Sequence, residues 1–288
     1  MSFEPRMMAV HAHPDDEASK GAGTMAKYAA KGRVRVVTCT GGERGSILNP
    51  RLAHRADIID NLPEVRKVEM ANAASALGIE HTWLGFIDSG LPEGDPLPPL
   101  PEGCFAAIDL DEPVRALVAE IREFQPQVLT CYNEQGGYPH PDHIRVHEVA
   151  MAAVKAAADP DFYPELGQPW QVSKVYYDVS FGRERISALH EEFLARGLES
   201  PLEDWLANKG DRPSRRVDAR IEVADYFPAR DAALRAHATQ IDPDGFFFAV
   251  PRDMEAEVWP WEDFELAFTV GERPDGVEDC LFAGIEEN

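Results

Sequence analysis

Two short stretches of the chain combine histidine, aspartate and proline in a way that could do chemistry. Residues 11–17 have the sequence HAHPDDE, and residues 138–143 have the sequence YPHPDH. Imidazole nitrogens and carboxylate oxygens are ligands of divalent zinc and iron, so His13, Asp16 and His143 are candidates for three ligands of one ion. Three protein ligands leave a position open on the metal, which is the arrangement that activates a water molecule.

Each stretch has a simpler explanation when it is considered alone. An aspartate before a helix often serves only as an N-cap, and Asp15, Asp16 and Asp142 could all do so. Two proline-stiffened stretches, each at the end of a predicted strand, favour a common site instead. A hydrolytic site needs a base beside its water and donors that face the developing oxyanion, and Asp15, His140 and Tyr138 are available in the same stretches.

The elements that must position these residues alternate between strand and helix. Runs of apolar, often β-branched residues predict strands over residues 7–11, 34–39, 81–86, 128–132 and 174–179. Helical spacing of apolar residues predicts helices over residues 17–31, 64–77, 112–124 and 143–158. This order predicts an α/β fold with a Rossmann-like parallel sheet and helices on both faces. Because ligands bind at the carboxyl ends of such strands, where the first strand borders the fourth, we expect the two stretches to meet there.

The pattern changes at about residue 180. Further helices are predicted over residues 183–196 and 224–239, and further strands over residues 217–223 and 264–268. We interpret residues 1–288 as a single catalytic unit. Its Rossmann-like core covers residues 1–180, and a C-terminal α+β extension over residues 181–288 packs on that core.

Composition excludes several classes of partner. Lys and Arg number 28 against 51 Asp and Glu, a net charge of −23, which argues against nucleic acid because polyanions are bound by basic side chains. No apolar run approaches the ~20 residues that cross a bilayer, so no membrane partner is expected. The four cysteines lie far apart, which is typical of thiols in a reducing compartment, and we expect a cytoplasmic protein. The sequence leaves the oligomeric state open.

The two stretches resemble the LmbE/PIG-L family of metal-dependent deacetylases, which cleave N-acyl groups from glucosamine-containing substrates. The HPDDE and PDH elements indicate only that superfamily. Longer segments are similar to the branch that hydrolyses the cysteinyl-glucosamine amide of mycothiol S-conjugates: residues 40–45, 47–50, 81–86, 88–92, 136–143 and 235–243. They favour this branch over its sister, which deacetylates N-acetylglucosaminyl-inositol.

The resemblance implies a role for each residue of the two stretches. His13, Asp16 and His143 match the ligands of one ion per chain, with Zn²⁺ expected and Fe²⁺ as the alternative. Asp15 matches the general base that takes a proton from the metal-bound water.

Three further residues match groups around the scissile amide. Tyr138 and His140 correspond to donors that polarise the carbonyl, and a protonated His140 would also help the amine to leave. Asp142 corresponds to a carboxylate that orients His140.

The resemblance also implies that four polar residues bind the sugar and inositol hydroxyls: Lys20, Glu43, Arg66 and Asp88. Each except Asp88 could equally be an ordinary solvated side chain. His11 and His237 are interpreted as core histidines with satisfied hydrogen bonds, although either could support the site from behind.

The predicted protein is thus a metal-dependent hydrolase that acts on a linear amide bond in a small thiol-sugar conjugate. The products would be a mercapturic acid and glucosaminyl-inositol, as in thiol-dependent detoxification. The alternatives are the biosynthetic deacetylase, an amidase of a natural-product pathway, a non-haem iron oxygenase and a sugar-binding module. The last two leave a base such as Asp15 without a purpose.

Overall fold

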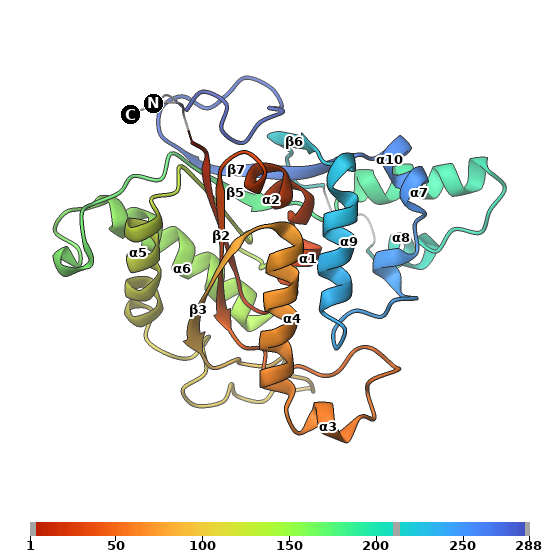
Figure 1. Ribbon diagram of the computed structural model, residues 1–288, viewed down its shortest axis with the longest axis horizontal. Coiled ribbons are helices and arrows are strands. Elements are labelled where there is room, and N and C mark those ends of the chain that lie inside the picture. The colour runs from red at the N-terminus through yellow and green to blue at the C-terminus, as the bar shows by residue number, and fades with distance from the viewer. Residues whose placement is uncertain (1–3, 210–213, 286–288) are drawn as a thin grey trace.

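The computed structural model describes residues 4–209 and 214–285. Its centre is a seven-stranded sheet with the strand order β3-β2-β1-β4-β5-β7-β6 (Figure 1). The strands are β1 (Arg6–His11), β2 (Arg33–Thr40), β3 (Glu80–Phe86), β4 (Val128–Cys131), β5 (Lys174–Asp178), β6 (Ala219–Glu222) and β7 (Trp261–Thr269). Strands β1 to β5 are parallel, whereas β7 is antiparallel to β5 and β6 is antiparallel to β7. The predicted α/β class and its parallel core are confirmed.

Helices cover both faces of the sheet, as Figure 1 shows. One face carries α5 (Asp111–Phe124) and α6 (Pro141–Ala158), and the other carries α2 (Ala22–Ala29), α4 (Leu62–Leu77) and α9 (Phe227–Ala236). The sequence of β1 is apolar without alternation because side chains on both of its faces are buried: Met7, Met8, Ala9 and Val10 are all 0% exposed.

The remaining helical segments are short or belong to the extension. They are α1 (Asp16–Ser19), α3 (Ala56–Ile59), α7 (Arg183–Ala195), α8 (Glu203–Lys209) and α10 (Arg252–Val258), with 3₁₀ turns η1 (Pro164–Leu166), η2 (Ala224–Tyr226) and η3 (Phe246–Phe248). Within residues 4–209 and 214–285, no helix is both long and apolar enough to span a membrane.

Three of the differences between the predicted and observed helix boundaries shape the site. The helix expected over residues 17–31 is two helices, α1 and α2, because Gly21 between them has a left-handed φ of 72°. Helix α6 begins at Pro141, which places the ligand candidate His143 in its first turn. The helix expected over residues 224–239 ends at Ala236, so residues 237–240 form a turn that faces the site.

The extension continues the sheet as well as covering it. Strand β7 pairs along β5, and β6 pairs along β7. Helix α9 packs on α4, where Leu234 and Ile241 of the extension share a buried cluster with Ala73 and Leu77 of the core. This buried cluster therefore contains side chains from both parts.

Candidate active site

Neighbouring strands bring the two histidine stretches together. Residues 12–15 follow β1 and residues 132–140 follow β4, and β1 and β4 pair in parallel. Tyr132, at the end of β4, stacks on His143 with ring centroids 4.2 Å apart and planes inclined by 7°. The expectation that the stretches meet at the carboxyl edge of the sheet is confirmed.

The two ring nitrogens of His143 face different groups: Nδ1 faces a backbone carbonyl, and Nε2 faces the carboxylate of Asp16. Its Nδ1 lies 3.0 Å from the carbonyl oxygen of Gly136, which can only accept, so Nδ1 carries the proton. The buried Nε2 has no hydrogen-bond partner and lies 3.4 Å from Asp16 Oδ2. In the neutral ring, a lone pair therefore faces a carboxylate oxygen, and a cation between them would satisfy both.

His13 is held in the complementary way. Its Nε2 lies 3.3 Å from Asp142 Oδ2 and 3.5 Å from Asp88 Oδ1, so this nitrogen carries a proton. Its Nδ1 then directs a lone pair toward Asp16 Oδ2, 3.5 Å away. Burial alone would lower the pKa of His13, but its hydrogen bonds with Asp142, Asp16 and Asp88 raise it well above the usual value. The surroundings of this ring thus favour a positive charge.

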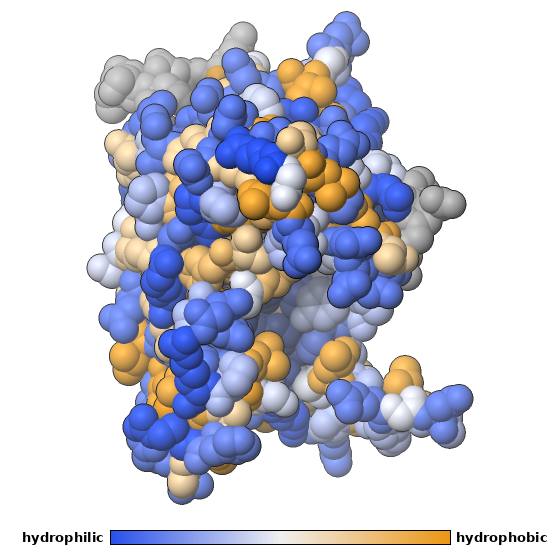
Figure 2. Space-filling view, turned by 90° about the vertical axis from the view of Figure 1, so that its right-hand side faces the viewer, coloured by the Kyte–Doolittle hydropathy of each residue, from blue (hydrophilic) through white to orange (hydrophobic). Residues whose placement is uncertain are grey.

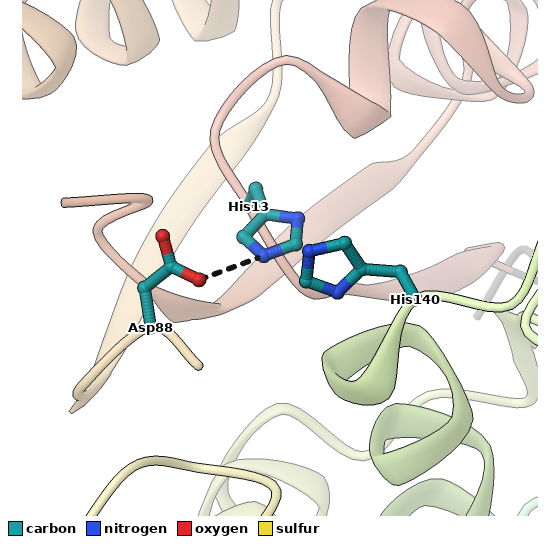
Figure 3. Close-up of side chains that lie close together, drawn as sticks. All are labelled: His13, Asp88 and His140. Atoms are coloured by element: carbon teal, nitrogen blue, oxygen red, sulfur yellow. Dashed lines mark ion pairs between the residues drawn. The ribbon is translucent and has the colours of Figure 1, made fainter. Parts of the chain in front are cut away.

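His13, Asp16 and His143 accordingly fit a divalent ion, because one ligand atom from each lies within 4.8 Å of the others. A second trio, His13 with Asp88 and His140, is equally compact (Figure 3). However, His140 Nδ1 accepts from the backbone N–H of Asp142 at 3.1 Å, which leaves the proton of the neutral ring on Nε2. His140 then has no free lone pair to offer, and the first trio fits better.

Asp16 is fixed by two further donors. Lys20 Nζ lies 2.6 Å from Oδ1, and the Tyr132 hydroxyl donates to Oδ2 at 2.7 Å. Although burial raises the pKa of Asp16, Lys20 and His143 outweigh it and hold the pKa well below its usual value. The carboxylate therefore stays ionised, as a metal ligand must.

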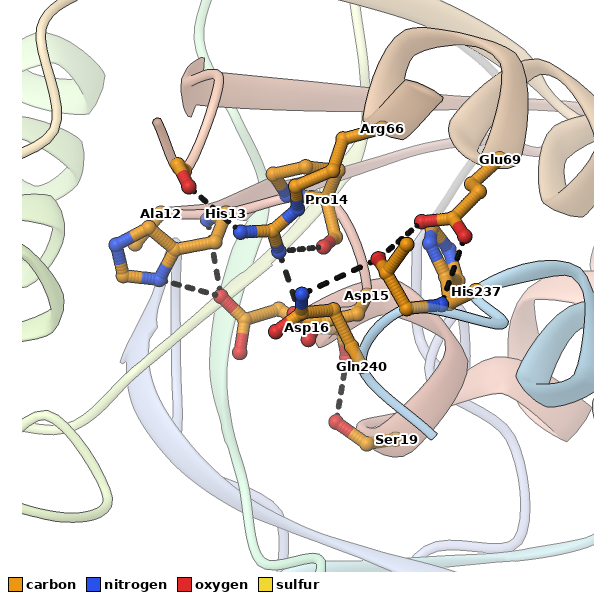
Figure 4. Close-up of polar contacts among 12 residues, drawn as sticks. Ala12, His13, Pro14, Asp15, Asp16, Ser19, Arg66, Glu69, His237 and Gln240 are labelled. Carbon is orange, nitrogen blue, oxygen red and sulfur yellow. Dashed lines mark hydrogen bonds and ion pairs between the residues drawn. The ribbon is translucent and has the colours of Figure 1, made fainter. Parts of the chain in front are cut away.

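The base candidate Asp15 is held in a rare backbone conformation with φ 121° and ψ −22°. Its backbone N–H donates to Glu17 Oε2 at 2.9 Å, and its carboxylate lies 3.6 Å from Arg66 Nη2 (Figure 4). Burial raises the pKa of Asp15, and Arg66 opposes this effect. A carboxylate of raised pKa accepts a proton more readily, which suits a general base.

A buried pair supports this loop from behind. His237 Nε2 lies 2.5 Å from Glu17 Oε1, and both side chains are fully buried. Burial would lower the pKa of His237, but Glu17 raises it above the usual value. Since the other carboxylate oxygen of Glu17 accepts from the Asp15 N–H, two consecutive hydrogen bonds connect the extension to the base candidate Asp15.

Tyr138 and His140 border the same site. Burial raises the pKa of the Tyr138 phenol, which therefore keeps its proton and can donate, and the side chain is 43% exposed. Burial, His13 and His143 lower the pKa of His140 to about 4. His140 is thus neutral at pH 7, with its proton on Nε2.

Asp142 contacts His140 only through its backbone. Its carboxylate accepts from the backbone N–H of Ser89 at 2.9 Å and from the Ser89 hydroxyl, and it faces His13 Nε2. The carboxylate thus orients the predicted ligand His13, while the N–H fixes the tautomer of His140.

A cleft of about 1350 Å³ opens above these residues, and Lys20, Arg66 and Asp88 line it. Figure 2 shows the surface hollowed on the face that carries the extension, with polar and apolar side chains around the hollow. Arg66 is only 3% exposed and donates to the carbonyl oxygens of Gly42 and Pro14 at 2.8 and 2.6 Å, so it mainly holds loops. Glu43 is not among the lining residues of the described chain, and it accepts from the Asp88 N–H at 3.1 Å.

Comparison with known proteins identifies the family. The family described as "PIG-L: GlcNAc-PI de-N-acetylase" matches residues 8–154. The chain belongs to this family. It is 56% identical to the mycothiol S-conjugate amidase of Streptomyces coelicolor over 293 residues, which cover 100% of both chains.

Two further proteins are similar to the chain. The 1D-myo-inositol 2-acetamido-2-deoxy-alpha-D-glucopyranoside deacetylase of Geodermatophilus obscurus is 43% identical over 99% of both chains. The N,N'-diacetylchitobiose deacetylase of Pyrococcus horikoshii shares the fold with a TM-score of 0.61 and 18% identity, covering 91% of this chain and 83% of that one. The predicted family is confirmed, and so is the predicted class of hydrolase acting on amide bonds.

Several residues that build the site of this PIG-L hydrolase were not singled out from the sequence. Tyr132 and Ser89 hold carboxylates of the site, and Glu17 holds the loop of the base candidate. Glu17 could have been noticed, since it ends the HPDDE element. His11 is buried with its Nδ1 3.3 Å from the Tyr132 hydroxyl, and burial lowers its pKa to about 4, so it is a neutral histidine of the core. Its Nε2 has no hydrogen-bond partner, so the hydrogen bonds expected for this ring are only partly satisfied.

Proposed function

We propose that this PIG-L hydrolase is a zinc-dependent amidase that cleaves the cysteinyl-glucosamine amide of mycothiol S-conjugates. The observation that carries this proposal is the 56% identity to a mycothiol S-conjugate amidase over the whole chain. The identity to the deacetylase of Geodermatophilus obscurus is lower, at 43%. The cleft of about 1350 Å³ also supports the proposal. Pockets that hold drug-sized ligands measure roughly 300–1,000 Å³, so the cleft has room for a bulky conjugate.

His13, Asp16 and His143 would hold the ion. Zn²⁺ in such a site supplies Lewis acidity, which makes a bound water easier to deprotonate and a carbonyl easier to attack. The hydrogen bonds around His143 and Asp16 leave a ligand atom available on each. On His13, the ion would take the place of the proton that the surrounding carboxylates favour at Nδ1.

Asp15 accepts the proton of the attacking water, in keeping with its raised pKa. The protonated carboxyl then returns this proton to the amine nitrogen as the C–N bond breaks, so the water is divided between the acid and the amine. Tyr138 and the Nε2–H of His140 donate hydrogen bonds to the oxygen on which negative charge develops. Because His140 is neutral, we assign it as such a donor in place of the protonated acid that the resemblance implied.

The test compares two substrates on one preparation whose zinc and iron contents are measured. Amine release from a mycothiol S-conjugate should exceed acetate release from N-acetylglucosaminyl-inositol by at least tenfold in kcat/KM. Removing the metal by chelation should abolish the activity, and Zn²⁺ should restore it. A preference for the acetylated substrate would instead establish the biosynthetic deacetylase.

A further inference from the structure

The cleft extends along the carboxyl edge of the sheet, and its two ends differ in chemistry. The strand order places the loops after β2 and β3 on one side of the metal trio and the loop after β5 on the other. On the first side, most lining residues with side chains are polar, although two leucines are among them: Arg44, Ser46, Leu48, Asp88, Leu91 and Glu93. On the second side, residues 179–181 lead directly from β5 into a group of aromatic side chains.

Three phenylalanine rings form that aromatic side. Phe181 lies 5.7 Å from Phe246 and 6.1 Å from Phe247, and Phe246 and Phe247 are 6.0 Å apart, measured between ring centroids. All three rings line the cleft, and Phe246 is 39% exposed. Tilted rings at these separations present edges and faces to a further ring, which is the geometry that aromatic groups prefer.

The same rings also line a second, smaller space. A cavity of about 60 Å³ lies beside them, and its apolar lining includes Ile186, Leu189, Leu234 and Val250. The cleft and this cavity share Phe181, Phe246 and Phe247 among their lining residues, so the rings border both spaces.

We propose that Phe181, Phe246 and Phe247 form a subsite for an apolar, preferably aromatic, group linked to the sulfur of the substrate. The inference rests on the proposed amidase function. The amine half of such a substrate is hydroxyl-rich and suits the polar side of the cleft, whereas the acyl half carries the S-linked group. With the scissile amide at the metal trio, the S-linked group lies on the β5 side. A deacetylase, which releases only acetate, has no use for this space.

The experiment uses two conjugates of the same thiol-sugar, one S-methyl and one S-benzyl. The wild-type protein should hydrolyse the S-benzyl conjugate with a kcat/KM about tenfold higher. Phe246→Ala should remove this preference by raising KM for the S-benzyl conjugate about tenfold, while kcat and all S-methyl values stay within twofold. Phe162→Ala is the matched control, because Phe162 is 52% exposed and lies outside the lining of the cleft.

Equal kinetics for the two conjugates in the wild-type protein would overturn the subsite, and so would equal losses for both in Phe246→Ala. If neither conjugate is hydrolysed, the proposed amidase function is wrong. The subsite is then tested separately, by measuring how compounds inhibit deacetylation of N-acetylglucosaminyl-inositol. S-benzyl-N-acetylcysteine, which is the acyl half alone, should inhibit the wild-type protein about tenfold more strongly than Phe246→Ala. The S-methyl analogue should not distinguish the two, and an equal inhibition constant for the S-benzyl compound refutes the subsite.

Discussion

Replacing Glu17 by glutamine should slow catalysis, although the Glu17 carboxylate forms no hydrogen bond with a side chain of the metal trio and does not line the cleft. Its two carboxylate oxygens hold the Asp15 N–H at 2.9 Å and His237 Nε2 at 2.5 Å. Glutamine keeps the shape of the side chain but loses the charge, and its single carbonyl oxygen cannot serve both donors. We therefore expect Asp15 to lose most of this support.

The magnitude follows from the backbone of Asp15. A non-glycine residue with a φ of 121° costs about 1–3 kcal/mol, and a hydrogen bond to a charged acceptor contributes about 1.5–3 kcal/mol in return. A neutral acceptor contributes about 0.5–1.5 kcal/mol, so the variant loses about 1–2 kcal/mol of support for the catalytic conformation. At 1.4 kcal/mol per factor of ten, kcat should fall about 5- to 30-fold.

The assay combines kcat with bound metal and the free energy of unfolding. Metal content should stay at the wild-type value, because His13, Asp16 and His143 keep their partners. Stability should fall by about 3–5 kcal/mol, since His237 is left buried without its charged partner. Glu64→Gln is the control: the Glu64 side chain is 72% exposed and pairs only with Lys67 at the surface, so neither quantity should change measurably.

Full kcat of Glu17→Gln at normal metal content would show that Asp15 does not depend on Glu17 for its catalytic conformation. A variant that unfolds would not answer the question, and His237→Asn then replaces it. This change keeps the charge of Glu17 and its bond to Asp15. The free energy of unfolding should therefore fall, while kcat should fall less than the about 5- to 30-fold expected for Glu17→Gln. A large loss of kcat at unchanged stability would contradict the proposed support.

Three further predictions concern the base, the metal and a distant ion pair. Asp15→Asn should retain the metal and lose about 10²–10⁴-fold in kcat, and a loss below tenfold would exclude Asp15 as the base. His143→Ala should lose most of its metal in dialysis, as measured by elemental analysis, whereas His147→Ala should not. Arg230 and its neighbours lower the pKa of Glu255 from 4.5 to about 2 despite its burial. Because the folded pKa is the lower one, this carboxylate contributes ~3 kcal/mol above pH 4.5 that is lost as the pH falls toward 2. Unfolding titrations of Glu255→Gln should show a shallower acid dependence than those of the wild-type protein.

The parallel core could be predicted because its strands are buried on both faces and leave an uninterrupted apolar pattern. The meeting of the two histidine stretches followed from general rules of strand order. The division of residues 17–31 into two helices did not, because helical spacing continues across Gly21 while the backbone turns there. Likewise, periodicity does not show that the helix before His237 ends early enough to leave a turn against the site.

The site shows a second limit of sequence reasoning, since a residue type does not say which of its groups is used. Asp142 serves His140 with its N–H and His13 with its carboxylate. Arg66 looked like a binder of hydroxyl groups, yet its hydrogen bonds are made with loop carbonyls. Tyr132 is indistinguishable from an ordinary strand residue until the fold brings its hydroxyl to Asp16.

The contact between Glu17 and His237 has a consequence for the order in which the enzyme becomes active during synthesis. The two residues are 220 positions apart, whereas His13, Asp16 and His143 have all left the ribosome well before His237 is made. At usual translation speeds of about 5–20 residues per second, synthesis from His143 to His237 takes roughly 5–20 s. A nascent chain can therefore assemble its metal trio while the base is still unsupported. Full hydrolytic competence is therefore expected only once the last part of the polypeptide has been made and His237 has reached Glu17.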